Sequence, residues 1–407
     1  MENKNFKKNF VWNMLGSTLN GFNSLFFMII ITRINGVGDA GVFSISFSLV
    51  CLFYIVGSYA GRTYQVTDNE SKYTDFDYIV QRVITCSLMI VIAFIYSYIS
   101  GYNEYKFTLV VLLTILKVLE AAGDVFYAIV QKRGELYKCG ISSAVKSLLS
   151  ISLLYIVDIM TKNLIISFIV VDIIWFVILI VYDIPNSKKY IKKDYSLIRV
   201  KNLFMSGFYA FAVLFLSVYL ANATKYALDG RVSSELQAVY GIIIMPATLI
   251  SLCLMYILQP YLNCLGESYI EGSKDSFQKI IKRIFIQIIL IGMLALVACT
   301  FLGIPVLNIV YSVELSNYLG CLQIIIVGAL FNALVTLLST ALTTLRNTGI
   351  QFLISLFCSI VVLIISPLLI EGYGLLGASI SYSVISLLQL VIYIIVYSIR
   401  MNKWMRH

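Results

Sequence analysis

This 407-residue chain is poor in the residues that most enzyme and metal sites require. Its single histidine is the last residue, His407, so histidine-based catalysis and histidine metal sites are close to excluded. The eight cysteines are scattered without a C-x-x-C spacing, which predicts neither a disulfide framework nor a metal cluster. Charged residues make up only 13% of the chain, against about 25% in soluble globular domains. A soluble globular enzyme is therefore a poor fit.

Apolar residues fill almost all of the chain, and 60% of its residues are hydrophobic. Twelve runs are each long enough to cross a bilayer, which takes roughly 20 mostly apolar residues. They are too long and too continuous for barrel strands, so we predict an all-α, multi-pass membrane protein. The predicted spans are Phe10–Ile34, Ala40–Tyr59, Ile79–Ile99, Phe107–Val130, Gly140–Ile159, Leu164–Tyr182, Leu203–Thr224, Leu236–Leu258, Ile284–Leu302, Tyr318–Leu342, Phe352–Ile370 and Leu375–Ile399.

A basic connector, Asp183–Asn202, divides the twelve spans into six and six. Because each half has an even number of spans, both halves enter the membrane in the same direction, and any internal repeat is parallel. We expect an N-terminal lobe over residues 1–185, a basic cytoplasmic linker over 186–202 and a C-terminal lobe over 203–407. Pro246 predicts a kink in the eighth span.

The cations of the loops are distributed unevenly. If the N-terminus is cytoplasmic, 23 of the 30 Lys and Arg residues fall in cytoplasmic segments, five in outer segments and two inside spans. This bias predicts that both termini are cytoplasmic. It also indicates that the basic loops contact membrane lipid and not nucleic acid. The outer loops are short, so the sequence offers no extramembrane domain for an enzyme active site.

Charged residues inside the spans are the strongest functional signal, because each costs about 2.5–3.5 kcal/mol on membrane-insertion scales. Lys117, Glu120 and Asp124 follow one face of the fourth span, while Lys146 and Asp172 lie in the fifth and sixth. Equal estimated depth in adjacent helices predicts that Asp124 pairs with Lys146. These charges form either a structural polar network or the lining of a cavity.

Small polar residues repeat at helical spacing in two further spans. They are Asn13, Ser17, Asn20 and Ser24 in the first span, and Asn332, Thr336, Ser339 and Thr343 in the tenth. Such stripes mediate helix–helix contacts in membranes or line a lumen, and the pattern leaves both readings open.

Motifs spread along the chain carry a family resemblance. They are Arg33…Gly36…Gly41-Val-Phe43, Gln131-Lys-Arg133-Gly-Glu135 followed by Lys146, Asn222-Ala-Thr-Lys225-Tyr226-Ala-Leu-Asp229, Gly303-Ile-Pro305-Val-Leu307-Asn-Ile-Val-Tyr311, and Leu345-Arg346-Asn-Thr-Gly349 followed by Tyr373-Gly374-Leu-Leu-Gly377-Ala378. In these the chain resembles the Wzx-type flippases of polysaccharide (O-antigen or capsule) repeat units, which belong to the multidrug/oligosaccharidyl-lipid/polysaccharide exporter superfamily. It departs from them at Lys225, where Arg is more usual, and at Ala238-Val239, where a glycine is usual.

The resemblance implies a substrate and a mechanism. An undecaprenyl-diphosphate-linked oligosaccharide would cross the bacterial cytoplasmic membrane by alternating access, through a cationic cavity between two six-helix lobes as in multidrug (MATE) exporters. Further partners would be a polysaccharide polymerase and its chain-length machinery. No cofactor is expected, and coupling to an H+ or Na+ gradient is left open.

Particular residues are expected to serve this transport. The cations Arg33, Lys117, Lys146 and Lys225 would bind the diphosphate, and the polar stripe with Asn13 and Asn20 would contact sugar hydroxyls. Glu120, Asp124 and Asp172 would line the cavity or couple transport to an ion gradient; no metal ligand is expected.

Three alternatives remain. A multidrug exporter of the same fold would favour acidic residues in both lobes, whereas spans seven to twelve contain no internal Asp or Glu. A lipid II flippase is another alternative, although two extra spans are usual in that group. A polysaccharide polymerase or ligase would be expected to carry a large outer loop.

Overall fold

The computed structural model describes residues 2–59, 61–68, 72–191, 194, 196–258 and 260–404. Every regular element in these ranges is a helix, so the predicted all-α fold class is confirmed. The chain forms two compact units, Met1–Phe215 and Leu216–His407. Their boundary lies inside one helix, beyond the predicted linker at 186–202. Residues 192, 193 and 195 of that linker, and His407, lie outside the described residues.

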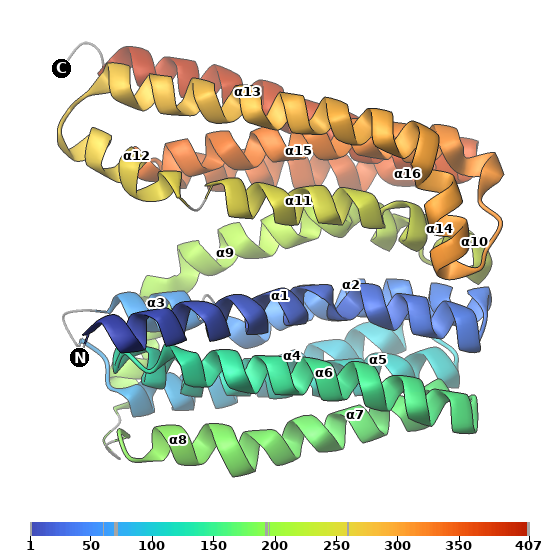
Figure 1. Ribbon diagram of the computed structural model, residues 1–407, viewed down its shortest axis with the longest axis horizontal. Coiled ribbons are helices and arrows are strands. Elements are labelled where there is room, and N and C mark those ends of the chain that lie inside the picture. Colours follow the sequence, from blue (N-terminus) through green and yellow to red (C-terminus); the bar gives the residue numbers. More distant parts are fainter. Residues whose placement is uncertain are drawn as a thin grey trace. The chain divides into compact units, whose positions relative to one another are not determined.

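The long helices of unit 1 run roughly lengthwise beside one another (Figure 1). Short helices occur at the ends of α2 and α7, where the chain turns between the long ones. The elements are α1 Glu2–Ile34, α2 Val37–Ser58, α3 Gly61–Thr67, α4 Asp75–Ile99, α5 Glu104–Lys132, α6 Leu136–Thr161, α7 Leu164–Ile178, the π-helical turn η1 Leu179–Asp183 and α8 Ile184–Lys188.

Unit 2 begins within α9 and is also built from long helices. Its elements are α9 Leu197–Leu228, α10 Ser234–Ile243, α11 Met245–Leu258, α12 Tyr261–Ile270, α13 Lys274–Ala298, the π-helical turn η2 Cys299–Gly303, α14 Ile304–Tyr311, the 3-10 turn η3 Ser316–Tyr318, α15 Leu319–Thr344 and α16 Thr348–Trp404. The predicted kink at Pro246 is confirmed, because α10 ends at Ile243 and α11 begins at Met245. Proline has no N–H to donate and clashes with the carbonyl four residues earlier.

The described helices agree with the twelve predicted spans. Among the described residues, ten stretches are long and apolar enough to cross a membrane. One of them, Thr348–Asn402, is broken at Gly374 (φ 57°, ψ −130°) into two helices of membrane length. The predicted fourth span corresponds to α5, which is not among the ten stretches and contains Lys117, Glu120 and Asp124. The internal two-fold relation between the halves stays a prediction.

Tight packing of α1 against α6 organises unit 1. The two helices approach at Gly16 and Gly140, where a Cβ on Gly140 would lie 2.2 Å from the carbonyl carbon of Trp12. Only glycine permits such an approach. Closer to the other end of α1, Phe27 packs edge-on against Phe168 of α7, with ring centroids 5.8 Å apart. These contacts fix α1, α6 and α7 around a shared interior.

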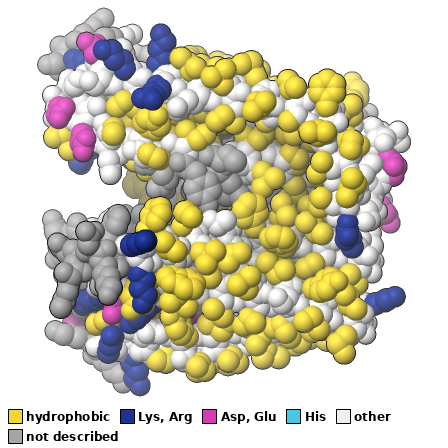
Figure 2. Space-filling model, in the orientation of Figure 1, with side chains coloured by type: hydrophobic (Ala, Val, Ile, Leu, Met, Phe, Trp, Pro, Cys, Tyr) yellow, Lys and Arg dark blue, Asp and Glu magenta, His cyan; other side chains and the backbone are white. Residues whose placement is uncertain are grey.

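The predicted cytoplasmic segments of unit 1 share one end of the unit. Asn9 in α1 donates to the carbonyl of Gly134 in the α5–α6 loop (2.8 Å) and accepts from the amide of Tyr137 (2.8 Å). Figure 2 shows many Lys and Arg side chains gathered at this end and hydrophobic side chains along the helices. Which side of the membrane this end faces stays a prediction.

Large apolar side chains cover the outer faces of the helices. Val83 of α4 and Leu294 of α13 are 62% and 69% exposed, and Ile173 of α7 is 54% exposed. In water such faces would be aggregation sites, whereas in lipid they match the solvent. The chain is therefore an integral membrane protein.

Candidate functional site

Unit 1 encloses a polar cavity of about 190 Å³ in its membrane interior. Its polar wall comes from α1 and α5, which contribute Asn20, Asn23, Lys117 and Glu120. Aromatic side chains of α1, α2 and α7 form the rest, including Phe27, Phe47 and Trp175. Two predicted site residues of α5 and one of α1 therefore meet at one cavity.

Lys117 is held at this cavity by its neighbour one helical turn away. Its Nζ lies 2.6 Å from Oε2 of Glu120, and the two side chains are 16% and 19% exposed. Asn20 donates to the other oxygen of Glu120 at 3.3 Å. An ammonium group carries three donors and this ion pair uses one, so Lys117 can also bind an anion. The rings of Phe47 and Tyr54, 5.2 and 5.4 Å from Nζ, lower the local polarity.

Asp124 continues the polar face of α5, as predicted, but its partners lie on α2 and α3. Tyr54 donates to its Oδ2 at 3.1 Å, and Nη1 of Arg62 lies 3.7 Å from its Oδ1. Arg62 also donates to Oε1 of Gln131 at 2.9 Å. The sequence places Arg62 in a cytoplasmic segment, which gives no indication that it reaches α5.

The predicted pair of Asp124 and Lys146 is wrong. Nζ of Lys146 lies 2.6 Å from Oδ2 of Asp183, and both side chains are almost fully buried. Ser142 donates to the other oxygen of Asp183 at 2.6 Å. Lys146 also lies over the ring of Trp175 and is not among the residues that line the unit 1 cavity.

The π-helical turn η1 explains the error. Sequence reasoning ended the sixth span at Tyr182 and assigned Asp183 to the connector. In the structure the helix continues through η1 into α8, so Asp183 stays inside the bundle. π-helical turns shift the face that a helix presents and are frequent at functional sites. Hydropathy carries no signal for such a turn.

Asp172 of α7 is a buried carboxylate of a different kind. It is 7% exposed, and neither oxygen has a hydrogen-bond partner among the described residues. It lies between Phe168 and Trp175 on the buried face of α7. An unpaired acidic residue inside a membrane bundle is a functional candidate by default, because its burial is costly.

The remaining predicted residues lie outside the unit 1 cavity. Arg33 is exposed in the last turn of α1, and Lys225 is half-buried in the last turn of α9. Asn13 is half-buried near the α1–α6 crossing. A common cavity for Arg33, Lys117 and Lys225 stays a prediction.

Unit 2 has a polar cavity of its own, of about 240 Å³, between α9, α15 and α16. Three residues of the predicted stripe in α15 line it: Asn332, Thr336 and Ser339. The fourth, Thr343, instead accepts a hydrogen bond from Gln351 at 3.0 Å. Among the described residues that line this cavity, none is charged.

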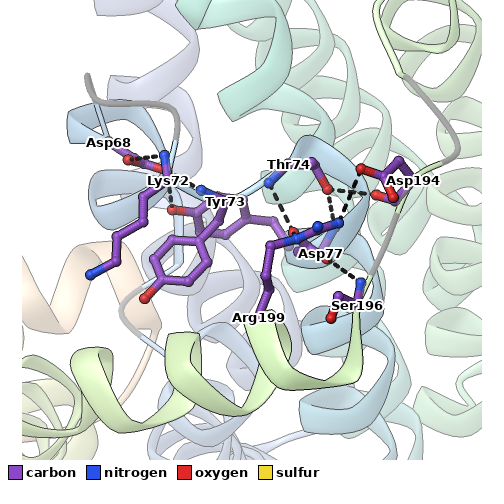
Figure 3. Close-up of polar contacts among 9 residues, drawn as sticks. Asp68, Lys72, Tyr73, Thr74, Asp77, Asp194, Ser196 and Arg199 are labelled. Carbon is purple, nitrogen blue, oxygen red and sulfur yellow. Dashed lines mark hydrogen bonds and ion pairs between the residues drawn. The ribbon is translucent and has the colours of Figure 1, made fainter.

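A third polar cluster, which sequence reasoning missed, fastens the start of α9 to the start of α4 (Figure 3). We call it the α4–α9 clasp; it comprises Thr74, Asp77, Asp194, Ser196 and Arg199. Asp77 accepts from Nε of Arg199 at 2.7 Å and from the amide of Ser196 at 3.0 Å. Arg199 also pairs with Asp194 at 3.2 Å. Thr74 caps α4 and donates to the carbonyl of Asp194 at 2.7 Å.

Comparison with known proteins bears on the whole chain. No protein-family model matches it. It is 23% identical over 396 residues to the capsular polysaccharide biosynthesis protein CapF of Staphylococcus aureus, covering 95% of this chain and 98% of that one.

Several solved structures share the fold of this chain over nearly its whole length, although their sequences are only distantly similar. An inward-facing multidrug resistance MATE family transporter of the MOP superfamily has a TM-score of 0.76 at 11% identity, covering 97% of this chain and 99% of that one. The Vibrio cholerae MATE transporter VcmN has a TM-score of 0.67 at 14% identity, covering 98% of each chain. This chain therefore has the fold of the MATE transporters.

Proposed function

We propose that this protein is a flippase that moves an undecaprenyl-diphosphate-linked oligosaccharide from the inner to the outer leaflet of the bacterial cytoplasmic membrane. The observation that carries the proposal is the Lys117–Glu120 pair, which puts a cation on the wall of a polar cavity inside the membrane. The fold of a transporter supports transport, and the CapF relative supports a polysaccharide substrate.

The chemistry follows from the substrate's headgroup. A diphosphate cannot cross hydrocarbon without compensation for lost hydration, and charge-assisted hydrogen bonds from an ammonium supply part of it. Glu120 keeps Lys117 neutralised between transport cycles, and Asn20 holds Glu120 in place. When the diphosphate arrives, Lys117 shifts its hydrogen bonds from Glu120 to phosphate oxygens. The lipid tail stays in the bilayer, so no cavity has to enclose it.

The other predicted residues take roles according to their burial. Arg33 and Lys225, at the outer ends of their helices, contact the headgroup at the outer mouth. Asp172, buried without a partner, is the candidate for coupling to H+ or Na+. Lys146 is assigned a structural role, because Asp183 neutralises it in a site closed on all sides. Both termini are cytoplasmic, and a polysaccharide polymerase with its chain-length machinery consumes the product.

A multidrug exporter of the same fold is the second candidate, and Asp172 favours it. A buried carboxylate without a partner suits a cationic drug. Against this reading, the carboxylate of Glu120 at the unit 1 cavity is already paired with Lys117, and Asp172 is not among the described residues that line that cavity.

The test is lipid flipping in proteoliposomes by the purified full-length protein. The probe is a fluorescent undecaprenyl-diphosphate-linked oligosaccharide, and its accessibility to an external quencher is followed over time. We expect Lys117→Gln to slow flipping by about 10- to 100-fold, the effect of losing a charged hydrogen bond of about 1.5–3 kcal/mol. Lys132→Gln is the matched control, because Lys132 lies at the end of the same helix and outside the cavity. Normal flipping by Lys117→Gln, or export of ethidium in place of the lipid, would overturn the proposal.

A further inference from the structure

The cavity of unit 2 has a different chemical character from that of unit 1. Of the fourteen described residues that line it, nine carry a hydroxyl or an amide and none is charged. The wall is formed by α9, by α15 and by α16, whose lining residues lie mostly in the half after the break at Gly374. A wall of neutral donors and acceptors carries no charge to offset the lost hydration of a diphosphate. The same polar groups would lose their hydration against a lipid tail, so the cavity suits neither ligand.

Two amides on this wall have no protein partner. Gln389 of α16 is 9% exposed and Asn332 of α15 is half-buried, and neither side chain makes a hydrogen bond with any residue that the structure describes. Both side chains line the cavity, where water or a ligand can supply the partner that the described residues do not. Each amide offers both a donor and an acceptor to the cavity.

The hydroxyls around the amides are oriented as acceptors. Thr336 donates its own proton to the carbonyl of Asn332 at 3.0 Å, and Ser386 donates to the carbonyl of Tyr382 at 2.8 Å. Their oxygens are left with lone pairs that can accept from a ligand. The rings of Tyr382 and Tyr393 complete the lining. An aromatic face with its partial negative charge packs well against the C–H bonds of a sugar ring.

From this lining we infer that unit 2 binds a neutral sugar residue of the substrate through Asn332, Gln389 and the hydroxyls beside them. A pyranose offers several hydroxyls, each both donor and acceptor, and this is the pattern that the wall complements. The volume of about 240 Å³ lies below the roughly 300–1,000 Å³ of pockets that enclose a drug-sized ligand, so it suits one ring and not an oligosaccharide. The inference rests on the proposed function and adds a second subsite to it.

If the polar wall had a purely structural role, its side chains would be expected to hydrogen-bond neighbouring helices. Some hydroxyls at the wall do join helices, as Thr224 does with Tyr240 (2.8 Å) and Ser339 does with Gln351 (2.8 Å). Asn332 and Gln389 join none of the described residues. If these amides were idle, replacing them with apolar side chains of similar shape would only raise stability.

The test measures binding of simple probes to the full-length protein in lipid nanodiscs. The probes are methyl glycosides of a neutral hexose and of an N-acetylhexosamine, followed by saturation-transfer NMR, and inorganic pyrophosphate, followed by calorimetry. We expect Gln389→Met and Asn332→Leu each to weaken glycoside binding by about three- to tenfold, the loss of one neutral hydrogen bond. Pyrophosphate binding should stay unchanged in both. Gln323→Met is the matched control, because Gln323 lies on α15 and donates to Thr300 at 3.2 Å.

The outcomes separate this inference from the proposed function. Binding of neither glycoside by the wild type, or equal glycoside binding by all variants, would overturn the sugar subsite even if lipid flipping is intact. Weakened glycoside binding in Gln389→Met and Asn332→Leu, with normal melting temperatures, supports it. The Lys117→Gln variant tests the diphosphate site separately. If it leaves pyrophosphate binding unchanged, this counts against the diphosphate site of unit 1 and not against the sugar subsite of unit 2.

Discussion

The two units differ in the kind of polar side chain that they place in the membrane interior. Unit 1 contains ionised side chains in its interior and neutralises most of them in pairs, such as Lys117 with Glu120 and Lys146 with Asp183. The cavity wall of unit 2 is built from hydroxyls and amides instead. Under the proposed function, the two halves bind different parts of one substrate, a charged group in unit 1 and a neutral one in unit 2.

Both units have an extensive apolar core, and they differ in the polar groups that they bury. Unit 2 has a large apolar cluster around α13 and α15, with Phe277, Ile284 and Leu337 at its centre. The buried ion pairs of the described residues lie in unit 1, whereas the buried hydrogen bonds described in unit 2 are neutral, as between the hydroxyls of Ser366 and Ser381. Unit 1 also buries the Lys146–Asp183 ion pair, and loss of one partner of such a pair is strongly destabilising because it leaves an unpaired buried charge. Substitutions of single polar residues should therefore affect unit 1 more than unit 2.

The largest effect is expected at the buried ion pair. Lys146→Met should lower the free energy of unfolding by about 3–5 kcal/mol, because it leaves Asp183 charged and buried. The neutral counterpart in unit 2, Ser366→Ala, should cost about 1 kcal/mol. Chemical denaturation in detergent, followed by tryptophan fluorescence, measures both. The double variant Lys146→Met/Asp183→Leu should recover most of the loss; if it is no more stable than the single variant, the pair is not the cause.

A charge introduced into the unit 2 cavity tests directly whether the interior of that unit tolerates only neutral polar groups. Thr336→Lys puts an ammonium on a wall without acidic residues, at a cost of about 2.5–3.5 kcal/mol. We expect a sharp fall in the amount of folded protein in membranes, measured by fluorescence-detected size-exclusion chromatography. Thr336→Val is the control for shape and should accumulate normally. Normal accumulation of Thr336→Lys would mean that the interior of unit 2 tolerates charge.

Asp124 should show a smaller effect, because its ion pair with Arg62 is long and partly exposed. The two side chains are 22% and 27% exposed, and the charged atoms are 3.7 Å apart. Asp124→Asn keeps an acceptor for Tyr54 and removes only the charge, so we expect a loss of about 0.5–1 kcal/mol. The same denaturation assay measures it. A loss as large as that of Lys146→Met would show that Asp124 has a second, stronger partner.

The smallest effect concerns Glu135 in the loop between α5 and α6, outside the spans. Partial burial opposes ionisation, but hydrogen bonds from Lys138 and Tyr190 prevail and hold the pKa of Glu135 below its usual value. A lowered pKa stabilises the fold above the unfolded pKa, and this stabilisation is lost as the pH falls through the folded one. Melting temperatures of Glu135→Gln and wild type should therefore differ at neutral pH and converge in acid.

Glu314 is the unit 2 counterpart of Glu135 and sharpens this comparison. Its pKa is also lowered, but by hydrogen bonds from the hydroxyl and amide of Ser316 and without a cation. Salt screens the interaction between Glu135 and Lys138 and leaves a hydrogen bond to Ser316 largely unaffected. Added salt should therefore reduce the effect of Glu135→Gln and not that of Glu314→Gln. Equal salt sensitivity would contradict the assigned partners.

Much of the fold, but less of the site, follows from the sequence. The long apolar runs predict the membrane helices directly, and Pro246 predicts the break between α10 and α11. Local spacing correctly brings Lys117 to Glu120, because residues three apart share a helical face. Asp183 could not be found in this way, since η1 changes the helical period and carries the residue into the bundle. The partners of Asp124 were missed for a related reason: Arg62 comes from α3, and no local pattern fixes where a short helix lies.

The clasp at the start of α9 has a mechanical consequence. Residues 197–215 of this continuous helix belong to unit 1, where Arg199 is fastened to Asp77 and Phe211 stacks on Tyr59 with ring centroids 4.6 Å apart. The remaining residues, 216–228, belong to unit 2. These contacts hold the first half of α9 against unit 1. The next helical turns of α9 carry Ser217 and Leu220, which line the unit 2 cavity, so the same rigid helix that is anchored in unit 1 supplies part of the wall of that cavity.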